Sequence, residues 1–227
     1  MDREFALWIN SPVGRWPFFD QFMVIVASGT LIKAAPLLAI VVAFWFRQRN
    51  TQDDKAKLLA GLAGALVALV LARVLQKAST WTVRPLQALP ELDLPANFTR
   101  SELADRSSFP SDTTTLAIAI STIIFVQNRA LGLLAFAWSA VMVAYPRLYL
   151  GLHYISDVLA GALLGAASVL AATLLYKRGA ALVAVVERRP DWSAALAFLF
   201  LFAMGSMFND VRALLTLVLE ELGIGSI

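Results

Sequence analysis

The chain of 227 residues is 59% hydrophobic and only 15% charged, with a formal net charge of +3 at pH 7. With a mean hydropathy of +0.71, this composition excludes an ordinary soluble domain and predicts one all-α integral membrane domain over residues 1–227. A chain with no cysteine and one histidine predicts no disulfide, no metal site and no cofactor. The basic residues lie in short loops, which indicates membrane topology and no nucleic-acid partner.

Six apolar segments are candidates for transmembrane helices, which need about 20 residues. In chain order they are 31–46, 57–76, 113–126, 130–145, 155–176 and 193–208. Residues 17–29 are shorter and contain Asp20, so we expect an interfacial helix that leads into the first span. Residues 211–223 are amphipathic and are expected to lie along the membrane surface. The predicted fold is a polytopic bundle of six transmembrane helices plus an N-terminal interfacial helix.

The charges of the loops predict their side of the membrane. Basic residues are in excess in loop 47–57, in the loop after the third span with Arg129, and in loop 177–192, so these three are expected to be cytoplasmic. In segment 77–112 the basic and acidic side chains balance. We therefore expect segments 77–112 and 146–154 to face outward, with 77–112 forming a loop over a site.

Two of the outward-facing stretches contain residues that suit anion binding. In KASTWTVRP, 77–85, Lys77 and Arg84 are seven positions apart at the end of the second span. Basic residues at a helix end also snorkel to the membrane surface, so this stretch alone leaves both interpretations open. In FPSDTTT, 109–115, Pro110 suits a helix entry and Ser111 or Asp112 an N-cap. The free amides of that helix start, with the Ser111 hydroxyl, also suit an anion.

The third stretch, PRLYLGLHYISD at 146–157, contains the one histidine of the sequence. Arg147 precedes His153 by six positions, and Asp157 follows it by four. Because an i, i+4 pair shares one face of a helix, we expect Asp157 to hold the His153 imidazole in one tautomer. A lone histidine is more often structural than catalytic, but ionisable groups at membrane depth indicate function. Together the three stretches supply the groups for phosphoryl transfer to a histidine without a metal.

These motifs resemble those of the type 2 phosphatidic-acid phosphatase superfamily of integral membrane lipid phosphatases. The signatures of that family are K-x6-R-P, P-S-G-H and S-R-x5-H-x3-D. KASTWTVRP matches the first in full, and PRLYLGLHYISD matches the third with Pro146 in place of serine. PSDT, 110–113, matches only the first two residues of the second. The order and spacing of the motifs and spans agree with the family from about Leu31 to Tyr176.

The resemblance implies a role for each matched residue. His153 is expected to form a phosphohistidine, and Asp157 to orient its imidazole. The phosphate is expected to be bound by Lys77, Arg84, Ser111 and Arg147.

The second signature differs from the family where it matters for catalysis. The family protonates the leaving group with the histidine of this signature, but here Thr113 occupies that position and no other histidine exists. Asp112 resembles the P-S-D-H variant of bacterial members that hydrolyse undecaprenyl pyrophosphate. We therefore treat Asp112 and Thr113 as auxiliary candidates.

The missing acid favours one class of substrate. An alkoxide leaving from a phosphate monoester is strongly basic, with a water-like pKa of roughly 16, and a general acid typically accelerates such a step about 10²–10⁴-fold. A phosphate leaving from a pyrophosphate has a last pKa of about 6 and can depart without a proton. The sequence thus predicts hydrolysis of a polyprenyl-type lipid pyrophosphate on the outer face of the membrane, expected to be a bacterial inner membrane.

Two other functions stay open from the sequence. A lipid phosphotransferase would use the same phosphohistidine and differ only in its acceptor. A silent lipid-phosphate binder or scramblase would keep the anion site without chemistry, although simple anion binding needs no Asp157 behind His153. A channel or secondary transporter lacks support, because the sequence has no repeat pair. The expected partners are the lipid substrate and membrane lipids; the sequence does not determine an oligomeric state.

Overall fold

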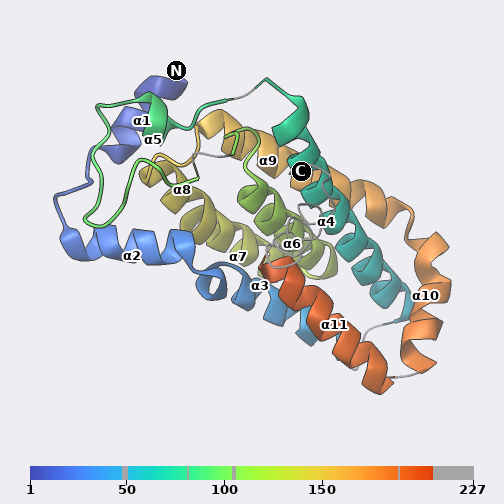
Figure 1. Cartoon of the computed structure of the whole chain (residues 1–227). Coiled ribbons are helices and arrows are strands. Elements are labelled where there is room, and N and C mark those ends of the chain that lie inside the picture. Colours follow the sequence, from blue (N-terminus) through green and yellow to red (C-terminus); the bar gives the residue numbers. More distant parts are fainter. Residues whose placement is uncertain (48–50, 81, 104–105, 189, 207–227) are drawn as a thin grey trace, which may run out of the picture.

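The computed structural model describes residues 1–206 with the exception of 48–50, 81, 104–105 and 189 (Figure 1). Over these residues the regular elements are all helices, so the predicted all-α class is confirmed. In chain order they are α1 (Asp2–Asn10), α2 (Pro17–Ser28), α3 (Thr30–Trp45), α4 (Gln52–Ala78), α5 (Pro85–Ala88), α6 (Asp112–Gln127), α7 (Arg129–Ser139), the π-helical turn η1 (Ala140–Ala144), α8 (Tyr145–Tyr149), α9 (Ile155–Leu174), α10 (Tyr176–Arg188) and α11 (Pro190–Gly205).

Several of these helices are long and apolar enough to cross a membrane, which indicates an integral membrane protein. Three reach that length: α4, the continuous helix Arg129–Tyr149, and α9. Helices α2 and α3 give a fourth if they form one span with a bend of 51°. Helix α6 is shorter, and the predicted segments 193–208 and 211–223 extend beyond the described residues. The expectation of six spans and an interfacial helix at 17–29 therefore stays a prediction.

Helix α6 is the centre of the bundle, and α3, α4, α7 and α9 pack around it (Figure 1). Its apolar side chains Leu116, Ile120, Ile123 and Ile124 are all buried in the main core. The segment expected to be the third span, 113–126, is thus enclosed by neighbouring helices.

The small residues of α9 let it approach α6 closely. A Cβ on Gly161 would lie 2.6 Å from the Ser111 carbonyl oxygen, and one on Gly165 would lie 2.3 Å from that of Thr115. Both distances are shorter than any real Cβ contact, so only glycine fits. The GALLG pattern packs within the bundle, and it thereby joins the helix that bears Asp157 to the helix that begins after Ser111.

One segment expected to be a loop is helical. Residues 177–192 were predicted to connect two spans, but they contain most of α10 and the start of α11. Helix α10 contacts α4 and α9, and Glu187 accepts a hydrogen bond from Gln52 and pairs with Lys55 at the start of α4. These polar contacts satisfy a helix that has little apolar length, which explains why hydropathy alone gave a loop.

The segment between α4 and α6 folds back over one end of the bundle (Figure 1). Arg100 organises it by donating hydrogen bonds to four backbone carbonyl oxygens, those of Leu86, Leu89, Pro90 and Leu92, at 2.7–3.0 Å. The Leu86 amide donates to the Gly151 carbonyl oxygen at 2.8 Å. The segment is thus fixed against the turn that precedes α9.

Candidate active site

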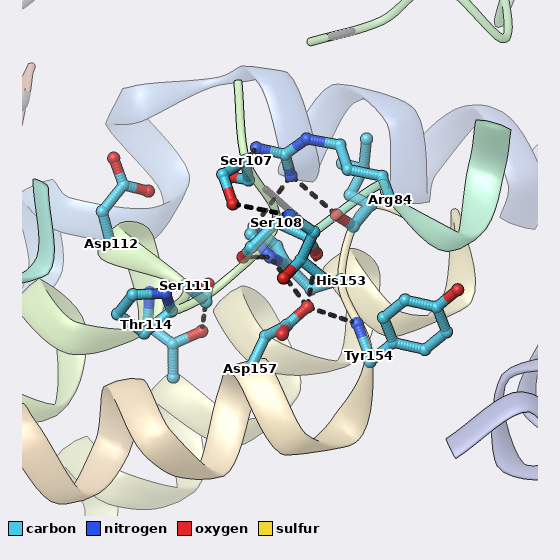
Figure 2. Close-up of polar contacts among 12 residues, drawn as sticks. Arg84, Ser107, Ser108, Ser111, Asp112, Thr114, His153, Tyr154 and Asp157 are labelled. Carbon is cyan, nitrogen blue, oxygen red and sulfur yellow. Dashed lines mark hydrogen bonds and ion pairs between the residues drawn. The ribbon is translucent and has the colours of Figure 1, made fainter. Parts of the chain in front are cut away.

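His153 lies in the turn between α8 and α9 and is only 2% exposed. The turn forms because Gly151 adopts a left-handed conformation, with φ at +65°. Nδ1 of His153 lies 2.9 Å from the Ser108 carbonyl oxygen. Since a carbonyl can only accept, Nδ1 carries the proton and donates it, and Nε2 keeps its lone pair. Nε2 faces the Arg84 guanidinium, 3.2 Å from Nη1 (Figure 2).

Asp157 supports the imidazole from the first turn of α9. Its Oδ2 accepts hydrogen bonds from the Tyr154 amide at 2.8 Å and from the Ser108 hydroxyl (Figure 2). The same oxygen lies 3.6 Å from His153 Nδ1, which is too long for a good hydrogen bond, so it acts mainly through its charge. Our expectation that both residues share a helical face is wrong: His153 precedes α9. The pair meets because the Ser108 carbonyl and hydroxyl hold the two side chains together.

Arg84 bridges the segments that surround His153. It is 3% exposed, and it donates hydrogen bonds to the carbonyl oxygens of Leu152 at 2.6 Å, Leu103 at 3.2 Å and Ser107 at 3.3 Å. Burial lowers the pKa of Arg84 to about 10. The guanidinium therefore remains positive at neutral pH and supplies a fixed cation beside Nε2.

Arg147 supplies a second buried cation, from α8. Its Nη2 donates to the Thr113 hydroxyl at 3.3 Å, so the residue at the position of the family histidine contacts the guanidinium. Nε of Arg147 is buried and has no hydrogen-bond partner among the described residues. A buried donor without a partner is costly, and a phosphate oxygen would satisfy it.

The start of α6 is capped by its own side chains. The Ser111 hydroxyl accepts from the Thr114 amide at 3.4 Å and lies 3.0 Å from the Thr114 hydroxyl. The Asp112 carboxylate accepts from the Thr113 amide at 2.7 Å. Figure 2 shows that Asp112 points away from the cluster around His153. Ser111 thus acts as the N-cap of α6. It is not among the residues that line the cavity described next.

A cavity of ≈ 300 Å³ brings most of the predicted residues together. Arg84, Asp112, Thr113, Arg147 and His153 all line it. Segment 77–112 contributes further lining residues, namely Phe98, Glu102, Leu103 and Arg106. Apolar side chains of α3, α6 and η1 also line it, including Leu37, Leu116, Ile120 and Val143. A cavity with a cationic end and an apolar end suits an anionic head group joined to a hydrocarbon chain.

Lys77 is separate from this cavity. It lies in the last turn of α4 with an exposed side chain, and it is not among the lining residues. Sequence reasoning also missed two cationic residues that do line the cavity, Lys33 and Arg106. The available signal for Lys33 was an ionisable side chain inside an apolar span; Arg106 gave no signal beyond its place in the outward loop.

The electrostatics of the cavity favour a neutral imidazole. Burial lowers the pKa of His153 below its ordinary value of 6.5, and the charges of Arg84 and Arg147 act in the same direction. The interaction with Asp157 opposes them. Because the unprotonated ring is the nucleophilic form, Nε2 is available for attack at neutral pH. Among the described residues no group of three His, Cys, Asp or Glu side chains could hold a metal ion.

The sequence of the chain is similar to two known proteins. The chain is 31% identical over 144 residues to the undecaprenyl-diphosphatase BcrC of Bacillus subtilis (strain 168). The aligned region covers 62% of this chain and 66% of that protein. It is 30% identical over 134 residues to the bacitracin transport permease protein BcrC of Bacillus licheniformis, covering 57% and 60%. Both matches span slightly less than two thirds of the relative.

The fold also matches a solved structure. The crystal structure of Aquifex aeolicus LpxE superposes with a TM-score of 0.55 over 74% of this chain and 92% of that one, at 23% sequence identity. The family model of the PAP2 superfamily matches residues 59–180, more than half of the chain, and contains Arg84, Arg147, His153 and Asp157. The resemblance seen in the motifs is thereby confirmed, and the chain belongs to the PAP2 superfamily.

Proposed function

We propose that this PAP2 superfamily member is a membrane lipid phosphatase that removes a phosphate from a lipid pyrophosphate of the polyprenyl type. The observation that carries the proposal is the orientation of His153. Its Nδ1–H is held by the Ser108 carbonyl oxygen, so Nε2 presents a lone pair beside Arg84 at the cationic end of the cavity. The relative named undecaprenyl-diphosphatase supports this class of substrate.

The chemistry follows from these groups. Nε2 of His153 attacks the terminal phosphorus, a P–N bond forms, and the bond to the bridging oxygen breaks to release the lipid monophosphate. An incoming phosphoryl group replaces the hydrogen bond between Nε2 and Arg84, and Arg84 and Arg147 then neutralise its oxygens. Asp157 stabilises the positive charge that the ring acquires. Water then hydrolyses the phosphohistidine and releases inorganic phosphate.

Thr113 explains the preference for a pyrophosphate. At this position the hydroxyl accepts a hydrogen bond from Arg147 and is far too weak an acid to protonate a leaving alkoxide. A lipid monophosphate is a weak base, with a last pKa of about 6, and departs as the anion. We place the site on the extracytoplasmic side of a bacterial inner membrane, supported by the balanced charges of segment 77–112.

The test is phosphate release by the purified protein in detergent without added metal. A polyprenyl pyrophosphate and phosphatidic acid are offered in parallel, and His153→Ala serves as the control. We expect release from the pyrophosphate, loss of release in the variant, and much slower release from phosphatidic acid. Equal rates for the two lipids would contradict the preference, and no release from either would point to a silent binder. Release that depends on an added lipid alcohol would indicate a phosphotransferase.

A further inference from the structure

Lys33 is a cation of the cavity for which the mechanism above has no use. It lies near the start of α3 and lines the cavity together with Thr113, Arg147 and His153, which come from other elements. It interacts electrostatically with both Arg147 and Asp112. An ammonium inside an apolar helix is costly unless it serves a site.

The position of Lys33 marks a boundary along the cavity. Leu37 follows it by one helical turn on the same face of α3 and also lines the cavity. On α6 the lining changes in the same way, from Asp112 and Thr113 to Leu116 and then Ile120. From Thr113 to Ile120 the helix rises roughly 10 Å. Lys33 therefore stands where the polar end of the cavity gives way to its apolar end.

The charges of the lining suit more than one phosphate group. Among the described residues, four cationic side chains line the cavity, Lys33, Arg84, Arg106 and Arg147, against the carboxylates of Glu102 and Asp112. Arg84 lies beside His153 Nε2, and Arg147 is joined to Thr113. These two cations serve the phosphoryl group that is transferred. Lys33 lies on a different helix, α3, where the lining residues that follow it, Ala34 and Leu37, are apolar.

We propose that Lys33 binds the phosphate that stays on the lipid, and that it thereby makes the cavity selective for lipid pyrophosphates over lipid monophosphates. The proposal rests on the proposed function for its choice of substrate. In a bound lipid pyrophosphate the terminal phosphate lies at His153, and the second phosphate, attached to the hydrocarbon chain, lies nearer Lys33. A monophosphate places its one phosphate at His153 and leaves Lys33 without a ligand. The ammonium also stabilises the charge that develops on the departing lipid monophosphate.

The competing interpretation is purely structural. Nζ of Lys33 donates a hydrogen bond to the Ala27 carbonyl oxygen at 2.6 Å, near the end of α2, so the side chain caps that helix across the bend. A lysine has three donors, which leaves two for a phosphate. A cap alone would affect every ligand of the cavity equally, whereas a phosphate subsite affects only ligands with a second phosphate. The ratio of two affinities therefore separates the two roles.

The experiment measures binding of two non-hydrolysable ligands to the full-length protein in detergent by calorimetry. One is a polyprenyl methylenediphosphonate, and the other is the matching polyprenyl phosphonate. We expect Lys33→Gln to weaken the diphosphonate about tenfold or more, because a hydrogen bond to a charged group is lost, and to change the phosphonate by less than about twofold. Lys33→Arg keeps the charge and should keep most of the discrimination.

A matched control is Lys57→Gln, which removes the same charge from α4, where Nζ lies over the Tyr176 ring at 5.1 Å outside the cavity. It should leave both affinities unchanged. Equal weakening of both ligands by Lys33→Gln, or no weakening of either, would overturn the subsite. Because binding needs no turnover, the result is independent of the hydrolysis assay. A wild-type protein that discriminates through Lys33 but releases no phosphate would overturn the proposed function and leave the subsite standing.

Discussion

Replacing Thr113 with histidine tests the argument about the leaving group. Thr113 lies in the first turn of α6, lines the cavity, and accepts a hydrogen bond from Arg147 at 3.3 Å. An imidazole at this position would extend into the cavity and could protonate an oxygen that leaves from phosphorus. A general acid is typically worth about 10²–10⁴-fold in rate, equivalent to roughly 3–5 kcal/mol of activation free energy. The gain applies only to a leaving group that needs a proton.

We therefore expect Thr113→His to raise kcat for phosphatidic acid by about 10²-fold or more. The same variant should change kcat for a polyprenyl pyrophosphate by less than about threefold, because its leaving group, a phosphate with a last pKa of about 6, departs without a proton. The assay is the initial rate of phosphate release from each lipid at saturating concentration. Thr113→Asn is the matched control, since an amide fills similar space and cannot donate a proton to an alkoxide. A gain of equal size on both lipids, or a gain shared by the asparagine variant, would refute the reasoning.

Two further predictions concern the nucleophile and the helix packing. Burial and neighbouring cations lower the pKa of His153, so the ring stays neutral below pH 6.5. We therefore expect kcat/KM for the pyrophosphate to fall only in more acidic solution. A pH–rate profile with a midpoint above 6.5 would contradict this prediction. Gly165→Ala places a Cβ 2.3 Å from the Thr115 carbonyl oxygen, and we expect it to destabilise the protein by about 1–3 kcal/mol in thermal unfolding. The control Ala167→Leu, on the exposed face of α9, should change the stability very little. Equal effects of the two variants would argue against tight packing of α6 on α9.

The central polar cluster shows how local chemistry and distant segments combine. Ser108 is the link that sequence reasoning missed: its carbonyl oxygen accepts from His153 Nδ1, and its hydroxyl donates to Asp157. Nothing in the sequence distinguishes Ser108 from its neighbour Ser107, because its role depends on where the outward segment crosses the turn before α9. The same segment supplies Arg84, whose hydrogen bonds to three carbonyl oxygens hold it against His153.

The sequence by itself determined the membrane class and the family, and it pointed to three of the residues that line the cavity, Arg84, Arg147 and His153. Hydropathy depends on local composition, and the motif spacings are features of the linear chain, namely those of Arg84, Arg147, His153 and Asp157. Both can therefore be predicted without the three-dimensional structure. The cap of α6 could be predicted for the same reason, since a cap involves residues three or four positions apart.

Only the tertiary structure decided which side chains share the cavity. Lys77 lies one helical position from the end of α4 and is exposed there, whereas Lys33, 44 positions earlier, lines the cavity with His153. The packing of α3 and α9 against α6 brings these distant positions together. Whether a charged side chain faces the cavity is decided only when its helix packs against its neighbours. That packing depends on contacts between residues that are far apart in the chain.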